Sequence, residues 1–285
     1  MQPSRGLSPS ALEAIAALER RVVAADGGRL KLEWGALRNR SGRSVEDLLW
    51  WDQDLLAGFL GIYSHGAPVL ELAGMVDPAA RRRGIGAALL DAALALCGER
   101  TGVTTLLVVP RASAAGRELA RSRGGTLDHS EHALELLTRP DDVPADPRLT
   151  LRPERPADRT AVRELLRAAF DWEPPAPEAA EAAREPVDPD AFVVERDGAV
   201  LGTVRLNLHR ERGEAGIYGF VVHPDHRGRG IGRDVLHRLC RGALTDGARR
   251  VHLEVATDND RALGLYTSLG FTPVTTEDYW ALPRP

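Results

Sequence analysis

The sequence predicts a mixed α/β fold in two tandem copies of one domain, each with a mostly antiparallel sheet flanked by helices. Three observations support this prediction. At 285 residues, the chain exceeds the usual size of one domain. The stretch RRRGIG at 81–86 returns as RGRGIG at 227–232, an offset of 146 residues. The same offset continues without a gap to Gly124 and Gly270, which indicates a duplicated domain.

A segment rich in proline and aspartate, 138–147, lies between the two copies. It interrupts the apolar periodicity on both sides, as a linker does. We therefore expect a boundary near residue 145, with a first domain over 1–140 and a second domain over 148–285.

The second half begins with a predicted strand at 149–152 and a helix from Asp158 to Phe170. Aspartate is a common helix cap, and the apolar residues at 162, 165, 166 and 169 recur with helical spacing. The Pro/Ala/Glu-rich stretch at 173–189 is expected to be a loop or a frayed helix.

Three strands follow, at 191–195, 200–208 and 215–222, and the first two are joined by a hairpin turn at 196–198. The third strand runs into RGRGIG. The remaining expected elements are a helix at 231–244, a strand at 249–256, a helix at 259–269 and a closing strand from Phe271. The first half repeats the later part of this order, with strands at 55–63, 69–76 and 104–109 and helices at 85–97 and 112–122.

Composition narrows the class of protein. With 27% charged residues and a net charge of −4, the chain has no general attraction for nucleic acid or for an anionic membrane. It lacks an apolar run of the roughly 20 residues that span a bilayer, and it lacks a signal-peptide pattern, so we expect a cytoplasmic protein.

Lys31 is the only lysine, which excludes a Walker-type phosphate loop. Cys97 and Cys240 are expected to be buried free thiols.

RGRGIG lies between a predicted strand and a predicted helix, a position where backbone N–H groups converge on one point and favour a diphosphate. Glycines at 228, 230 and 232 permit close approach of the backbone, and three arginines add positive charge. Arg233 occupies the place of the third glycine of a dinucleotide fingerprint, which argues against a Rossmann fold. The alternative is a helix-capping turn with solvated arginines.

Both arginine-glycine stretches match R-x-x-G-x-G, and the segment 253–271 reads LEVATDNDRALGLYTSLGF. Together these motifs resemble the GNAT acetyltransferase family, and the duplication resembles its tandem members, the mycothiol synthase branch. The resemblance implies acetyl-CoA as the acetyl donor, with no metal. It also implies direct attack by a primary amine, such as a mycothiol precursor, in a monomer or homodimer. The alternatives are an acetyltransferase for peptide or protein N-termini and a non-catalytic acyl-CoA-binding module.

The resemblance also implies roles for individual residues. Tyr266 holds the position of the general acid, Glu254 that of the base, and Asn259 that of a cofactor contact. In the mycothiol synthase branch the base position corresponds to Gly216, and Glu214, two residues away on the same strand face, is a rival base. The other expected cofactor contacts are Phe220, Val221, Val222, Arg227, Gly228, Arg229, Gly230, Ile231, Gly232 and Arg233 in the second copy, and Met75, Val76, Arg81, Arg83, Gly84 and Gly86 in the first.

The offset of 146 residues shows which side chains the first copy has at the positions of the expected catalytic residues. It maps the acid, base and asparagine positions of the second copy to Ala120, Val108 and Ser113 in the first. None of these side chains can replace its counterpart. We therefore expect the first copy to be non-catalytic while keeping the loop that could hold acetyl-CoA.

Overall fold

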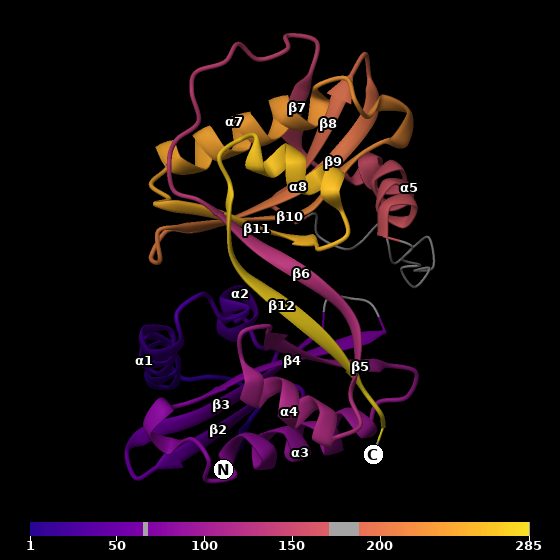
Figure 1. The fold of residues 1–285 in the computed structure, drawn as a ribbon. Helices are drawn as coiled ribbons and strands as arrows, with labels where there is room; N and C mark the ends of the chain where they lie inside the picture. Colours follow the sequence, from indigo (N-terminus) through magenta and orange to yellow (C-terminus); the bar gives the residue numbers. More distant parts are fainter. Residues whose placement is uncertain (65–67, 171–187, 285) are drawn as a thin grey trace. The chain divides into compact units, whose positions relative to one another are not determined.

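The computed structural model describes residues 1–64, 68–170 and 188–284 (Figure 1). The chain forms two compact units, one of Met1–Glu131 with Thr275–Pro285 and the other of His132–Val274. These limits differ from the division expected near residue 145, because the last strand returns to the first unit. The expected loop at 173–189 lies almost entirely outside the described residues.

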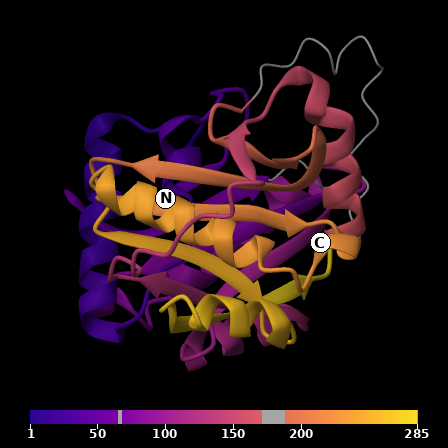
Figure 2. The same ribbon diagram turned by 90° about the horizontal axis from the view of Figure 1, so that it is seen from above.

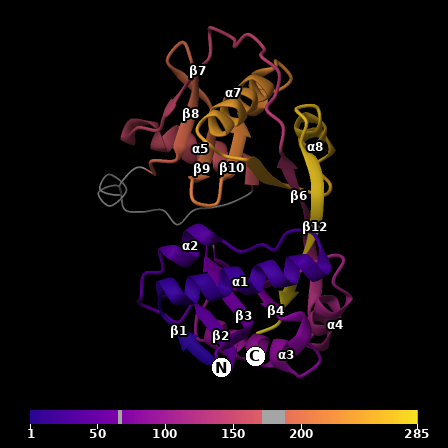
Figure 3. The same cartoon turned by 90° about the vertical axis from the view of Figure 1, so that its left-hand side faces the viewer.

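The first unit has the strand order β1-β2-β3-β4-β5-β12-β6. Helices α1 and α2 cover one face of this sheet, and α3 and α4 cover the other (Figures 1 and 3). Its elements are β1 (Gln2–Ser4), α1 (Pro9–Asp26), α2 (Trp34–Arg38), β2 (Asp47–Asp52), β3 (Leu55–Ser64), β4 (Val69–Val76), α3 (Ile85–Gly98), β5 (Thr104–Pro110), α4 (Ala114–Ser122), the start of β6 (Thr126–Leu136) and most of β12 (Thr272–Leu282).

The second unit has the order β6-β11-β10-β9-β8-β7. Helix α7 runs along its strands (Figure 2), and α5 packs against β9 and β10. Its elements are the end of β6, β7 (Thr150–Pro153), α5 (Arg159–Phe170), β8 (Ala191–Arg196), β9 (Ala199–His209), β10 (Glu214–Val222), α7 (Ile231–Thr245), β11 (Arg250–Ala256) and α8 (Asp260–Thr267).

Most predicted elements are confirmed within one or two residues, including the hairpin, where Asp197 and Gly198 have φ of 52° and 78°. Two expectations are wrong. Asp158 does not cap α5. Its carboxylate instead accepts a hydrogen bond from the Arg155 amide and forms an ion pair with Arg152. The closing strand does not complete the second unit, because its residues 277–282 pair with β5 of the first unit.

The core of the second unit lies between its sheet and helices α7 and α8. Alternate residues of a strand point to opposite faces, so Ala215 and Ile217 of β10 and Leu253 of β11 are buried in this core. Cys240 of α7 is buried there as a free thiol, and Cys97 of α3 is a buried free thiol in the first unit, as predicted. No helix of the described segments is long and apolar enough to cross a membrane.

Candidate active site

Both arginine-glycine stretches form the same turn between a strand and a helix. Gly84 begins α3 with φ of 80°, and Gly230 begins α7 with φ of 79°, left-handed conformations that suit glycine. No side chain caps the first turn of either helix, so the opening N–H groups point outward as in an anion site. Arg81 and Arg227 each donate from Nε to the last carbonyl of the preceding strand.

The arginines of the first loop are neutralised within their own unit. Arg81 donates to both carboxylate oxygens of Asp26, the last residue of α1. This hydrogen bonding raises the pKa of the Arg81 guanidinium. Arg83 pairs with Asp52 at 2.8 Å. The remaining arginine, Arg82, faces Glu118 at 3.9 Å. The first loop therefore presents much less net positive charge to a ligand than its sequence suggests.

The second loop differs in this respect. Arg227, Arg229 and Arg233 are exposed, and none of them has a carboxylate partner among the residues that the structure describes. Arg233 points to the carbonyl of Ser268, at 3.5 Å. The second loop combines open helix amides with unneutralised guanidinium groups, which is the chemistry that binds a diphosphate.

Backbone strain also separates the loops. Arg82 has φ of 62°, a left-handed conformation that costs a residue with a side chain about 1–2 kcal/mol. Its counterpart in the second copy is Gly228, with φ of 76°. The second loop reaches the same turn without that cost.

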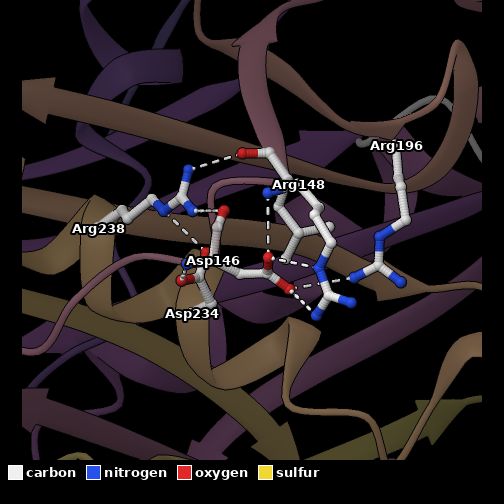
Figure 4. A network of polar contacts seen from close by, with 6 residues as sticks. Asp146, Arg148, Arg196, Asp234 and Arg238 are labelled. Atoms are coloured by element: carbon white, nitrogen blue, oxygen red, sulfur yellow. Dashed lines mark hydrogen bonds and ion pairs between the residues drawn. The ribbon is translucent and has the colours of Figure 1, made fainter.

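An ion-pair network joins the segment before β7 to helix α7 (Figure 4). The amide of Asp146 donates to Asp234 in the first turn of α7, and the Asp146 carboxylate accepts from Arg148 and Arg196. Arg238 pairs with Asp234 and donates to the carbonyl of Asp146. Hydrogen bonds from Arg148 lower the pKa of Asp146 to about 2. The network holds this segment beside the start of α7.

The same segment forms a wall of an open cavity of about 880 Å³ next to the second loop. Arg229, Gly230 and Arg233 line it from the loop, and Ser268–Gly270 line it from the end of α8. Arg139 and Arg148 line it from the segment between the copies. Four arginines line this space beside the start of α7, together with the aspartates Asp141, Asp146 and Asp234.

Tyr266 lies on α8, and only 8% of it is exposed. Burial disfavours the phenolate and raises the pKa of Tyr266 to about 12. The hydroxyl therefore keeps its proton at neutral pH, as a general acid must. The ring packs edge-on against Phe271, with centroids 6.1 Å apart.

The two predicted base candidates have different surroundings. Glu254 is half-buried on β11, on the face opposite the apolar core. Glu214 begins β10, where Arg212 and Arg250 pair with its carboxylate. Burial alone would raise the pKa of Glu214, but hydrogen bonds and charge from these arginines lower it below its usual range. A carboxylate held in this way is a weak proton acceptor.

Asn259 occupies the N-cap position of α8, where its side-chain oxygen accepts from the amide of Ala262 at 3.1 Å. This capping role is sufficient reason for an asparagine at this position. Its side-chain NH₂ group still leaves a donor for a ligand.

Two residues of this site were not singled out in the sequence. Tyr218 of β10 and His252 of β11 approach each other, with 3.3 Å between Oη and Nε2. The strand-period alternation places both on the same face as Glu254, and that alternation is the signal that could have found them.

Known proteins resemble this chain in sequence and in fold. The Acetyltransferase (GNAT) family model matches residues 12–124 and 159–271. A mycothiol acetyltransferase of Streptomyces avermitilis is 31% identical over 95% of this chain and 91% of its own length. An acetyltransferase of Pectobacterium atrosepticum is 40% identical over 30% of this chain and 61% of its own length.

A solved GCN5-related N-acetyltransferase from Sphaerobacter thermophilus has the same fold, with a TM-score of 0.77 and 22% identity over 99% of this chain and 96% of that one. The family model matches once in each half, which confirms the duplication inferred from the offset of the two loops. The chain therefore belongs to the GNAT acetyltransferase family, as a tandem member with two copies of the domain.

Proposed function

We propose that this protein transfers the acetyl group of acetyl-CoA to the primary amine of a small metabolite, and that its C-terminal copy performs the reaction. The observation that carries this proposal is the contrast between the two loops. The arginines at 81–83 face carboxylates of their own unit, whereas Arg227, Arg229 and Arg233 have none among the described residues. The copy with the open loop is also the copy with Tyr266.

In this proposal the diphosphate of acetyl-CoA binds the opening amides of α7, at Gly230, Ile231 and Gly232. A carbon at the Cβ position of Gly232 would lie 3.2 Å from Leu265 and 3.5 Å from Phe220, so a larger residue would crowd the loop. The pantetheine arm runs beside Phe220, Val221 and Val222, and Asn259 contributes its NH₂ group. The nucleotide enters the cavity lined by Arg229 and Arg233.

The chemistry needs a base for the amine and an acid for the departing thiolate. The substrate nitrogen attacks the acetyl carbonyl carbon, and Glu254 takes a proton from that nitrogen in the tetrahedral adduct. Tyr266 gives its proton to the sulfur of CoA as the carbon–sulfur bond breaks. The raised pKa of Tyr266 suits this role, because the phenol is protonated across the neutral range.

The N-terminal copy is proposed to be non-catalytic, because Ala120, Val108 and Ser113 stand at the positions of the acid, base and asparagine. Its loop would bind acetyl-CoA only when Arg81 and Arg83 exchange their carboxylates for phosphate oxygens. We therefore propose that this loop, with Met75, Val76, Gly84 and Gly86, binds acetyl-CoA more weakly than the loop at 227–233.

The acceptor is proposed to be the amine precursor of mycothiol, cysteinyl-glucosaminyl-inositol, on the basis of a relative that matches nearly the whole chain. A peptide N-terminus is the second candidate, because residues 253–271 resemble the segment of N-terminal acetyltransferases. The test is a panel of amines that includes both, assayed for CoA release and for the acetylated product by mass spectrometry. Tight acetyl-CoA binding with no product from any amine would instead indicate a binding module.

A further inference from the structure

From β9 to β11, the sheet of the second unit carries a row of polar side chains on the face opposite its apolar core. In the recorded register, Glu214 of β10 lies between His209 of β9 and Arg250 of β11, and Gly216 lies between Asn207 and His252. Tyr218 follows on the same face, opposite Arg205. The alternate positions of β10 and β11 belong to the apolar core. Helix α5 packs against β9 and β10. The polar side chains along β10 and β11 are suited to ligand chemistry.

Tyr218 and His252 lie side by side on this face. Their Oη and Nε2 atoms are 3.3 Å apart, the rings meet edge-on at 86°, and only 6% of His252 is exposed. The Tyr218 ring lies over Gly216, where a Cβ atom would come within 2.5 Å of its Cε2 and 2.7 Å of its Oη. The tyrosine therefore fills the space that a larger side chain at 216 would need.

The pair lies where β10 and β11 part. Their last recorded partners are Gly216 and His252. Beyond this point, β10 has an irregularity between Tyr218 and Val221, and Gly219 has φ of 55°. In the proposed function the acyl arm runs along 220–222, so its thioester end reaches β10 beside Tyr218.

We propose that Tyr218 and His252 act as a proton-transfer pair for the substrate amine, an inference that rests on the proposed acetyl transfer in the C-terminal copy. Tyr218 is the catalytic residue, because its hydroxyl faces the amine. His252 is the positioning residue: it orients the Tyr218 hydroxyl and receives the proton that this hydroxyl passes on. Imidazole suits this role because its ordinary pKa, about 6.5, lies close to neutral pH.

The amine enters as an ammonium and leaves as an amide, so it gives up two protons. Tyr218 Oη accepts the first while its own proton passes to His252 Nε2, and the neutral nitrogen attacks the acetyl carbon. Glu254 accepts the second proton from the tetrahedral adduct as the carbon–sulfur bond breaks, and Tyr266 protonates the thiolate. Water then returns the proton of Glu254 to Tyr266, and His252 releases its proton to solvent. One proton leaves for each amide formed.

The charged neighbours of the pair are already partnered. Arg250 pairs with Glu214 at 2.5 Å and with Glu135 of β6 at 3.5 Å. Arg205 pairs with Asp188 at 3.3 Å. Glu254 is a further titratable group on β11, and the experiment tests it separately.

The test compares Tyr218→Phe, His252→Asn and Glu254→Gln by the pH dependence of kcat/KM, with acetyl-CoA and the best amine of the panel. We expect Tyr218→Phe and His252→Asn each to lower kcat/KM about 100-fold at pH 7, in the range of general-base catalysis. Both should remove the acidic limb of the profile, whereas Glu254→Gln should lower the rate and keep that limb. His209→Asn, on the same face, is the matched control and should keep the wild-type profile.

A His252→Asn variant with the wild-type rate and acidic limb would overturn the proposal, as would loss of that limb in Glu254→Gln alone. Acetyl-CoA titration verifies that each variant is folded. NMR titration of the His252 ring, in the intact protein and in Tyr218→Phe, gives a readout that does not need turnover. If the wild type acetylates no amine, the proposed function fails. The proton-transfer role falls with it, whereas in a wild type that acetylates an amine an unchanged His252 titration midpoint in Tyr218→Phe would refute the pair alone.

Discussion

The guanidinium group of Arg81 donates to both carboxylate oxygens of Asp26, at 2.8 and 2.6 Å. The corresponding arginine of the second copy, Arg227, has the same hydrogen bond to the preceding strand but no recorded carboxylate partner in the described part of the chain. The acidic residue at the end of α1 thus reduces the positive charge that the first loop offers to a ligand.

Replacing Asp26 and Asp52 with alanine should strengthen acetyl-CoA binding at the first loop. Exposed ion pairs contribute about 0.2–1 kcal/mol each, so we expect a gain of a few fold. Isothermal titration calorimetry in low salt would show it as a second site, or as a tighter weak site. Asp54→Ala, an exposed aspartate in the same turn, is the control. No change in the double variant would mean that these pairs do not limit binding.

Gly230→Val should abolish acetyl-CoA binding at the second loop and acetyl transfer with it. A β-branched residue at φ of 79° is strained, and relief of that strain would move the amides of α7 out of line. Gly84→Val is the matched control, because Gly84 has φ of 80° at the start of α3. The control should keep the wild-type kcat in a steady-state assay. Equal loss of kcat in both variants would refute the assignment of chemistry to the C-terminal copy.

Tyr266→Phe should lower kcat by roughly 100-fold or more while acetyl-CoA still binds. The ring is buried against Phe271, and phenylalanine keeps that packing while it removes the proton donor. Because the pKa of Tyr266 is raised to about 12, the wild type should retain the acid form throughout pH 7–10. A thiol-release assay measures both kcat in the variant and the pH dependence of the wild type. Unchanged turnover in the variant would exclude Tyr266 as the acid.

Asp146→Asn should lower the melting temperature more at pH 7 than at pH 3. The pKa of Asp146 is about 2 in the folded protein, below the ordinary value for aspartate, so its stabilising effect exists above the unfolded value and is lost as pH falls. Thermal unfolding followed by circular dichroism at several pH values would show the two curves converging. Asp225→Asn, at an exposed aspartate, should show no such convergence. Parallel curves for Asp146→Asn would contradict the role of the network.

The repeat and most elements could be predicted from the sequence because they depend on local signals. Glycines at fixed offsets, a hairpin turn at 196–198 and apolar residues with helical or alternating spacing each act over a few residues. The end of the chain could not be assigned in this way. Residues 277–282 read as the last strand of the second copy, yet their partners are in β5, and pairing between strands far apart in sequence leaves no local trace.

The sequence by itself determined the family, the duplication and the copy that has a tyrosine, a glutamate and an asparagine in the matching positions. Only the tertiary structure decided which loop arginines are paired with carboxylates and which groups surround the candidate bases Glu214 and Glu254. Asp26 lies 55 residues before Arg81, and Arg250 lies 36 residues after Glu214. Electrostatic interaction depends on distance in space, and only the folded chain sets those distances.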